Sequence, residues 1–154
     1  IVFGDWSSDV CSSDLKGMFA SPEKIRVTYH DPCHLGRHMG IFEDPRQVIT
    51  KIKNIQLVEM PRNRDNAWCC GAGAGVKSQY KDWAVEISEA RVQEAIDIAK
   101  DGKGEIRYIV SACPFCERNI SDAIISLQNK GVEGSKNLEM IDLLQLLKRC
   151  KKIL

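Results

Sequence analysis

The sequence predicts an α/β fold, because short apolar runs with strand character alternate along the chain with longer segments of helical period. Alternation of this kind is typical of a parallel sheet covered by helices. Five cysteines also follow three of the predicted strands, at the sheet edge where such proteins carry functional loops. We therefore expect a small three-layer, Rossmann-like parallel sheet with flanking helices and with cysteine loops at the C-terminal edge of its strands.

Four predicted elements precede a cysteine pair in the middle of the chain. They are a strand, a short helix, a second strand and a long polar loop: Ile25 to His30, Pro45 to Ile52, Ile55 to Met60 and Pro61 to Trp68. The first strand ends at Asp31-Pro32, because a proline cannot donate to the ladder of a sheet. We expect Asp44 to cap the short helix and Pro45 to occupy its first position.

Five predicted elements follow the pair. They are a helix, a strand, a helix, a strand and a helix: Ser78 to Lys100, Arg107 to Ala112, Pro114 to Leu127, Asn137 to Ile141 and Asp142 to Lys151. The first helix ends at Asp101-Gly102, a typical helix stop. Pro114 suits the first turn of the next helix, where its missing N–H leaves no bond unmade.

The first fifteen residues do not resemble a folded segment. They lack the basic and apolar regions of a signal peptide and show no helical or strand period. Gly4 to Leu15 corresponds to the in-frame translation of a common sequencing-adapter string. We therefore expect residues 1–15 to be a non-native, adapter-derived segment and residues 16–154 to form a single domain, with the authentic protein continuing upstream of Lys16.

Composition and charge narrow the class of protein. Apolar residues make up 44% of the chain, and no run approaches the roughly 18 apolar residues that a membrane span needs. The formal charge is +1, and it becomes +4 without Asp5, Asp9 and Asp14, because 22 basic residues then face 18 acidic ones. These charges are interspersed, which favours a solvated surface over nucleic-acid binding. We expect metal or redox chemistry in the cytoplasm rather than a disulfide scaffold.

The cysteine spacing is the strongest functional signal in the chain. It reads C-x35-C-C-x42-C-x2-C and comprises Cys33, Cys69, Cys70, Cys113 and Cys116. A structural zinc ion takes four ligands, usually as two short-spaced pairs. Neighbouring residues of an extended chain point to opposite sides, so adjacent cysteines bind one small ion only through a tight turn. A polynuclear iron–sulfur cluster relaxes this demand, because the two sulfurs can bind different irons. The pair therefore favours a cluster over zinc.

Glycines and a histidine flank these cysteines. Gly71, Gly73 and Gly75 permit positive φ and close backbone approach, so that N–H groups can donate to cluster sulfides. A tight turn or a phosphate-binding nest is the alternative interpretation. His34, next to Cys33, is a candidate proton donor and therefore the candidate catalytic residue. A hydrogen-bonded loop histidine is the simpler interpretation of the same residue.

At three motifs, D-P-C-H-L-G-R, W-C-C-G-A-G and A-C-P-F-C, the sequence resembles the CCG cysteine-rich domain family. The resemblance covers Ile25 to Cys150 and is greatest to heterodisulfide reductase catalytic subunits and their relatives in sulfite-reduction complexes. It implies that the five cysteines of the pattern ligate a noncubane 4Fe–4S cluster. It also implies that two such domains face each other to cleave a small disulfide in two one-electron steps, with the cofactor supplying the chemistry.

The resemblance further implies a larger assembly. The chain looks like the C-terminal fragment of a larger polypeptide that works with a second CCG domain and with other iron–sulfur or flavin subunits. Contact with a membrane is expected only through a partner. We expect the isolated chain to be inactive, because it carries one CCG motif. The alternatives are an iron–sulfur subunit of a flavin-linked glycolate, lactate or glycerol-3-phosphate oxidase, and a structural zinc-binding domain.

Two features depart from the family pattern. The gap of 42 residues between Cys70 and Cys113 is longer than usual, so Asp101 to Glu105 is expected to be a small insertion between a helix and a strand. Ala74 stands where the family usually has a glycine, and its methyl group is expected to crowd the cluster slightly.

Overall fold

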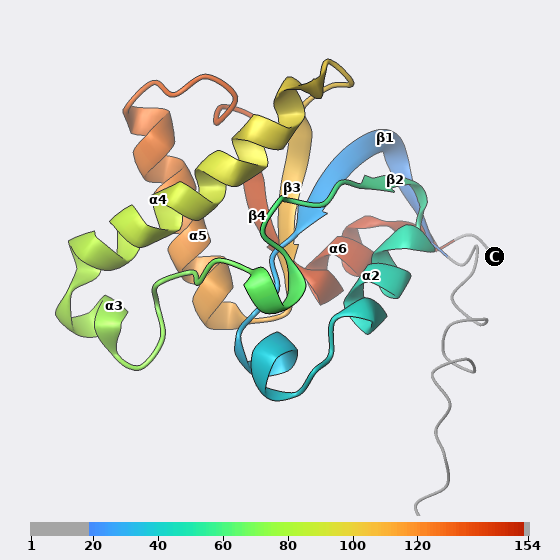
Figure 1. The fold of residues 1–154 in the computed structure, drawn as a ribbon. Helices are drawn as coiled ribbons and strands as arrows, with labels where there is room; N and C mark the ends of the chain where they lie inside the picture. The colour runs from blue at the N-terminus through green and yellow to red at the C-terminus, as the bar shows by residue number, and fades with distance from the viewer. Residues whose placement is uncertain (1–18, 153–154) are drawn as a thin grey trace, which may run out of the picture.

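The structure, a computed structural model that describes residues 19–152, contains a parallel β-sheet with helices on both faces (Figure 1). Its order is β2-β1-β3-β4, formed in that order by Lys53–Leu57, Phe19–Tyr29, Ile106–Ser111 and Glu139–Asp142. A short strand, β5 (Lys151–Lys152), pairs antiparallel with the start of β1. The predicted α/β class and parallel sheet are confirmed. The predicted adapter-derived segment, residues 1–15, lies outside the described residues.

Helices connect the parallel strands. Within residues 19–152 the α-helices are α2 (Glu43–Thr50), α3 (Val76–Gln79), α4 (Lys81–Asp97), α5 (Pro114–Asn129) and α6 (Leu143–Arg149). A π-helical turn and two 3-10 turns complete the set: His34–His38, Arg64–Asn66 and Ile98–Asp101. None of the helices in this range is both long and apolar enough to cross a bilayer.

Two hydrophobic cores, one on each face of the sheet, account for the three layers. Figure 1 shows α4 and α5 on one face and α2 and α6 on the other. The first core includes Val92 of α4 and Ile120 of α5, and the second includes Ile49 of α2. Ile109 and Val110 are neighbours in β3 and belong to opposite cores. This arrangement follows from the strand geometry, in which successive side chains point to opposite faces.

The predicted start of the first helix was wrong. Helix α2 begins at Glu43, so its N-cap is Phe42, which offers no side-chain cap, and Asp44 lies inside the first turn. Pro45 is the third residue of the helix rather than the first. It is tolerated there because N–H groups in the first turn have no partner within the helix.

The predicted helix from Ser78 to Lys100 is also divided. The backbone at Tyr80 (φ −131°, ψ 63°) separates α3 from α4, and a 3-10 turn follows α4. Tyr80 is no helix breaker, so the periodicity carried no sign of this interruption. Helix α5 does begin at Pro114, as predicted. Helix α6 ends at Arg149, so Lys151, predicted to lie in that helix, belongs to β5 instead.

The segment predicted to be an insertion, Asp101 to Glu105, is tied to the sheet. Arg26 of β1 donates to both carboxylate oxygens of Asp101, at 3.0 Å and 2.6 Å. The same guanidinium donates to the carbonyl oxygen of Gly104. These residues therefore precede β3 at its amino end, which is the edge of the sheet opposite the cysteines.

Candidate metal centre

The five predicted cysteines come together at the carboxyl edge of the sheet. Cys33 follows β1, Cys69 and Cys70 follow β2 after a long loop, and Cys113 and Cys116 follow β3. All five line one cavity of about 720 Å³. Parallel strands end at the same edge, so loops far apart in the sequence meet there. The convergence is a consequence of the topology.

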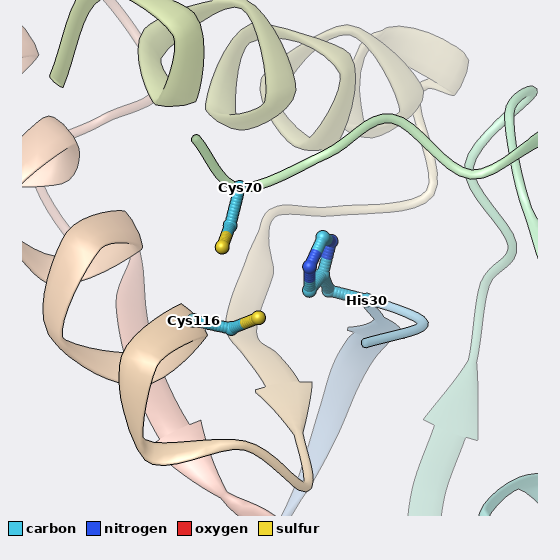
Figure 2. Close-up of side chains that lie close together, drawn as sticks. All are labelled: His30, Cys70 and Cys116. Atoms are coloured by element: carbon cyan, nitrogen blue, oxygen red, sulfur yellow. The ribbon is translucent and has the colours of Figure 1, made fainter. Parts of the chain in front are cut away.

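Cys70 and Cys116 form the buried part of this cluster together with a histidine that the sequence did not single out. Figure 2 shows His30, at the end of β1, with its ring facing both sulfurs. The ligand atoms of the three side chains lie within 4.8 Å of one another, and all three residues are buried. Cys69 is exposed, while Cys33 and Cys113 are half-buried. The cysteines therefore extend from a buried end beside His30 to an open end at the surface.

The thiols interact with one another in a chain. The interaction of Cys69 with Cys70, and that of Cys70 with Cys116, reinforced by burial, raise the pKa of Cys69 and of Cys70. The pKa of Cys70 rises to about 12. Thiolates are the form that binds metals. A cation must therefore displace the thiol protons, which is the usual coupling between metal binding and proton release.

The turn after the cysteine pair is built around Gly71. Its φ is +80°, and a Cβ there would lie 2.9 Å from the carbonyl oxygen of Ala84. Its N–H donates to Sγ of Cys69 at 3.3 Å. Of the three glycines expected to permit a positive φ, Gly71 and Gly75 (both φ 80°) adopt one and Gly73 does not. Ala74 (φ 51°) takes a positive φ as well.

Asn119, three residues after Cys116 on α5, holds this turn in place. Its side-chain amide donates to the carbonyl oxygen of Cys70 and, at 2.8 Å, to that of Ala84. Lys77 of α3 donates to Oδ1 of Asn119 at 2.5 Å. Sequence reasoning missed Asn119. The one signal for it was its place on the helical face that carries Cys116, and an asparagine at that position also suits a solvated surface.

His34, the predicted proton donor, lies in the π-helical turn and lines the cavity. Its ring stacks on His38 with 5.0 Å between centroids. Arg37 of the same turn donates to the carbonyl oxygens of Asp65 and Ala67. These bonds join the Cys33 loop to the segment before the cysteine pair.

Arg91 of α4 influences the protonation state of His30. Its Nε donates to Nδ1 of His30 at 3.1 Å, and its Nη1 donates to the carbonyl oxygen of Arg62 at 2.7 Å and to Glu94 at 2.6 Å. Burial, and next the charge of Arg91, lower the pKa of His30 to about 3. The imidazole is therefore neutral at physiological pH. Neither residue of this pair was predicted as part of the site.

The rim of the cavity is basic and partly apolar. Lys77, Lys81 and Arg118 line it, as does Phe115, whose side chain is 67% exposed. Asp122 is an acidic residue on the same lining and pairs with Lys77 at 2.5 Å. The open end of the cluster therefore faces solvent across a surface that suits an anionic or apolar ligand.

Similarity to known proteins agrees with this geometry. The chain is 49% identical over 102 residues to one subunit of the dihydromethanophenazine:CoB--CoM heterodisulfide reductase of Methanosarcina acetivorans, which is 66% of this chain and 24% of that protein. It is 43% identical over 122 residues, 79% of this chain and 28% of the relative, to the subunit of the same name from Methanosarcina barkeri. It is also 34% identical over 125 residues, 81% and 23% respectively, to one subunit of the fumarate reductase (CoM/CoB) of Methanothermobacter marburgensis.

The chain thus spans about a quarter of the length of these relatives. The profile of the cysteine-rich domain known as CCG matches residues 27–121, a range that begins in β1 and ends in α5. That range includes all five cysteines that line the cavity. The chain belongs to the CCG cysteine-rich domain family.

Proposed function

We propose that the chain is the iron–sulfur redox domain of a disulfide reductase of the heterodisulfide type. In this proposal Cys33, Cys69, Cys70, Cys113 and Cys116 hold a noncubane 4Fe–4S cluster. The observation that carries the proposal is that five thiols from three loops line one cavity. The relatives named as heterodisulfide reductase subunits support the substrate class, a small disulfide.

The donor set fits a cluster better than a single ion. Five thiols exceed the four ligands of a tetrahedral zinc site. Cys69 is exposed while its neighbour Cys70 is buried, so the adjacent sulfurs lie in different environments and can reach different irons. The N–H of Gly71 already donates to a cysteine sulfur, as backbone groups do around iron–sulfur clusters.

In this arrangement the cluster and the protein residues have different roles. When bound, the cluster would supply one-electron transfer and an open iron for a substrate sulfur. The chain's own residues bind and orient. Lys81 and Arg118 at the rim are to attract an anionic substrate, and the buried side chains of Cys70 and Cys116 are to exclude water from the inner end.

Cleavage of a disulfide to two thiols consumes two electrons and two protons. We assign one of these protons to the imidazole of His34, an exposed residue that lines the cavity beside Cys33, and the other to solvent water at the open end of the cavity. In this proposal the electrons come from iron–sulfur or flavin subunits of a complex. A second CCG domain faces this cavity. Membrane contact is to occur only through such partners, with this domain on the cytoplasmic side. The chain alone is therefore expected to bind the cluster and not to turn over a disulfide.

The first experiment is anaerobic reconstitution of the chain with iron and sulfide, followed by metal and sulfide analysis and low-temperature electron paramagnetic resonance. We expect about four irons and four sulfides per chain, the content of a 4Fe–4S cluster. Cys69→Ser and Cys70→Ser should lose them. Cys150→Ser is the matched control, because Cys150 is buried in the other core, away from the cavity.

A structural zinc site is the second candidate. His30, Cys70 and Cys116 are buried and close enough to share one ion. Zinc at one per chain without bound sulfide, retained in a Cys33→Ser variant, would establish this candidate and contradict the cluster proposal. Iron with sulfide excludes it.

A further inference from the structure

His30 lies against the buried end of the cysteine cluster in a fixed position. Its backbone continues the sheet beyond β1, because its N–H donates to the carbonyl oxygen of Val110 at 2.8 Å. Its own carbonyl oxygen accepts from the hydroxyl of Ser111 at 2.9 Å. The residue is 1% exposed. In Figure 2 one ring nitrogen faces the sulfurs of Cys70 and Cys116 while the other is turned away.

Arg91 determines which ring nitrogen carries the proton. A guanidinium is always protonated and has donors but no acceptor. Its Nε donates to Nδ1 of His30 at 3.1 Å, so Nδ1 is an acceptor and carries no hydrogen. An imidazolium has no acceptor nitrogen, so the ring that accepts this bond is neutral and its single N–H is at Nε2. That N–H is the group left to face the two sulfurs.

The same contact argues against His30 as a metal ligand. A histidine that binds a metal through one nitrogen nearly always donates the N–H of the other to a carboxylate, carbonyl or water. His30 has the reverse arrangement, because its second nitrogen meets a donor. Arg91 is itself held by Glu94 and by the carbonyl oxygen of Arg62, and its side chain is 0% exposed. It is therefore not free to turn away and release Nδ1.

We propose that His30 is an Nε2–H donor to sulfur at the buried end of the cluster and raises its reduction potential, with Arg91 holding the tautomer that makes this possible. The inference rests on the proposed function, in which Cys70 and Cys116 are ligands. Reduction adds negative charge to cluster and thiolate sulfurs, and a hydrogen bond stabilises the more negative state, so the donor favours reduction. His30 is a positioning and tuning residue, and it touches no substrate.

Two amide substitutions of His30 distinguish the role of Nδ1 from that of Nε2. His30→Asn places a carbonyl oxygen near the position of Nδ1, which keeps a partner for Arg91 and removes the distal donor. His30→Gln extends an amide N–H to about the position of Nε2 and so restores the donor. His38→Asn is the matched control, because His38 is exposed and does not line the cavity. The measurement is a potentiometric titration of the reconstituted chain, followed by electron paramagnetic resonance.

We expect all three variants to hold as much iron and sulfide as the unsubstituted chain. His30→Asn should shift the potential to a more negative value, His30→Gln should return it towards the original, and His38→Asn should leave it unchanged. An unchanged potential in His30→Asn refutes the donor. Loss of iron from both His30 variants refutes the donor role and indicates that His30 is a metal ligand. Absence of iron from the unsubstituted chain refutes the proposed function instead.

The tautomer can be tested without a cluster and without a variant of His30. Long-range proton–nitrogen correlation spectra of the chain labelled with nitrogen-15 and not reconstituted report which ring nitrogen carries hydrogen. The chain has three histidines, so His34→Gln and His38→Gln assign the signals. We expect His30 as the Nε2–H tautomer. An Nδ1–H signal would overturn the inference whatever the reconstitution experiment gives.

Discussion

Arg46 and Asp31 form a buried two-bond ion pair, with Nη1–Oδ1 at 2.6 Å and Nη2–Oδ2 at 2.8 Å. Their side chains are 4% and 2% exposed. Asp31 also accepts from the backbone N–H of Arg64 at 2.8 Å, so one carboxylate joins the end of β1, α2 and the loop before the cysteine pair. Burial alone would raise the pKa of Asp31, but the hydrogen bonds from Arg46 and Arg64 hold it below its ordinary value.

Removal of the Asp31 charge should destabilise the fold. Asp31→Asn leaves the buried guanidinium of Arg46 with Glu59 as its only carboxylate partner among the described residues. Loss of one member of a buried pair costs about 3–5 kcal/mol when the remaining charge has no other partner, so with Glu59 in place we expect a loss of at most about 3 kcal/mol. Denaturant unfolding at neutral pH measures the effect. Glu43→Gln, which breaks an exposed pair with Arg64, is the control and should cost less than about 1 kcal/mol. Equal losses of stability in the two variants would contradict the conclusion that Asp31 joins β1, α2 and the loop before the cysteine pair.

The glycine turn should respond differently at three neighbouring positions. Gly71→Ala forces a methyl group to within 2.9 Å of the carbonyl oxygen of Ala84 at a positive φ, and should cost about 2–4 kcal/mol. Gly73→Ala meets open space and should change stability by less than about 0.5 kcal/mol. Ala74→Gly removes a left-handed alanine and should stabilise by up to about 1 kcal/mol. Thermal unfolding of the three variants gives this order, and a neutral Gly71→Ala would refute the geometry of the turn.

Asn119 should matter for both stability and iron binding. Asn119→Ala leaves the carbonyl oxygens of Cys70 and Ala84 without its amide, which should cost about 1–3 kcal/mol and lower iron retention after reconstitution. Ser121→Ala on the same helix removes only a bond to the carbonyl oxygen of Glu117. That control should stay within about 0.5 kcal/mol. Full iron retention by Asn119→Ala would show that the turn needs no support from α5.

The ion pair between Glu89 and Lys130 predicts a pH-dependent stability far from the cysteines. Both carboxylate oxygens of Glu89 contact Nζ of Lys130, at 2.6 Å and 2.7 Å. Burial alone would raise the pKa of Glu89, but these bonds hold it below its ordinary value of 4.5. Because the folded-state pKa is the lower one, the stabilisation is present above pH 4.5 and is lost as the pH falls through the folded-state pKa.

Glu89→Gln should therefore destabilise the chain at pH 7 by less than about 1 kcal/mol, since Lys130 is more than half exposed. The difference from the unsubstituted chain should vanish when the carboxyl group is protonated in both the folded and the unfolded state. Urea unfolding at neutral and acidic pH measures it. A difference that is the same at both pH values would mean that the substitution acts through packing and not through charge.

Local sequence patterns were sufficient to predict the fold class and to predict that the cysteines lie at one edge of the sheet. Strand and helix periods alternate along the chain, and in a parallel sheet the residues that follow the strands share one edge. Cys33, Cys69, Cys70, Cys113 and Cys116 could therefore be placed together from the sequence alone. Helix ends were less predictable: Asp44 is a typical N-cap residue, yet α2 begins one residue before it, and nothing in the sequence pattern marks Tyr80 as the break between α3 and α4.

The buried polar contacts could not be predicted in this way. Arg91 and His30 are separated by 61 positions, and Asn119 and Cys70 by 49. An arginine or asparagine within an amphipathic helix indicates a solvated face until packing buries it, and its partner then has to come from another element.

The sequence by itself determined the strand and helix order and the set of thiols that the sheet topology brings to one edge, because both follow from local periodicity and spacing. Only the tertiary structure decided that His30 faces the buried sulfurs as a neutral ring, and that Ala74 rather than Gly73 takes a left-handed conformation. These outcomes depend on which polar groups and backbone carbonyls α4 and α5 present to the loops when they pack on the sheet.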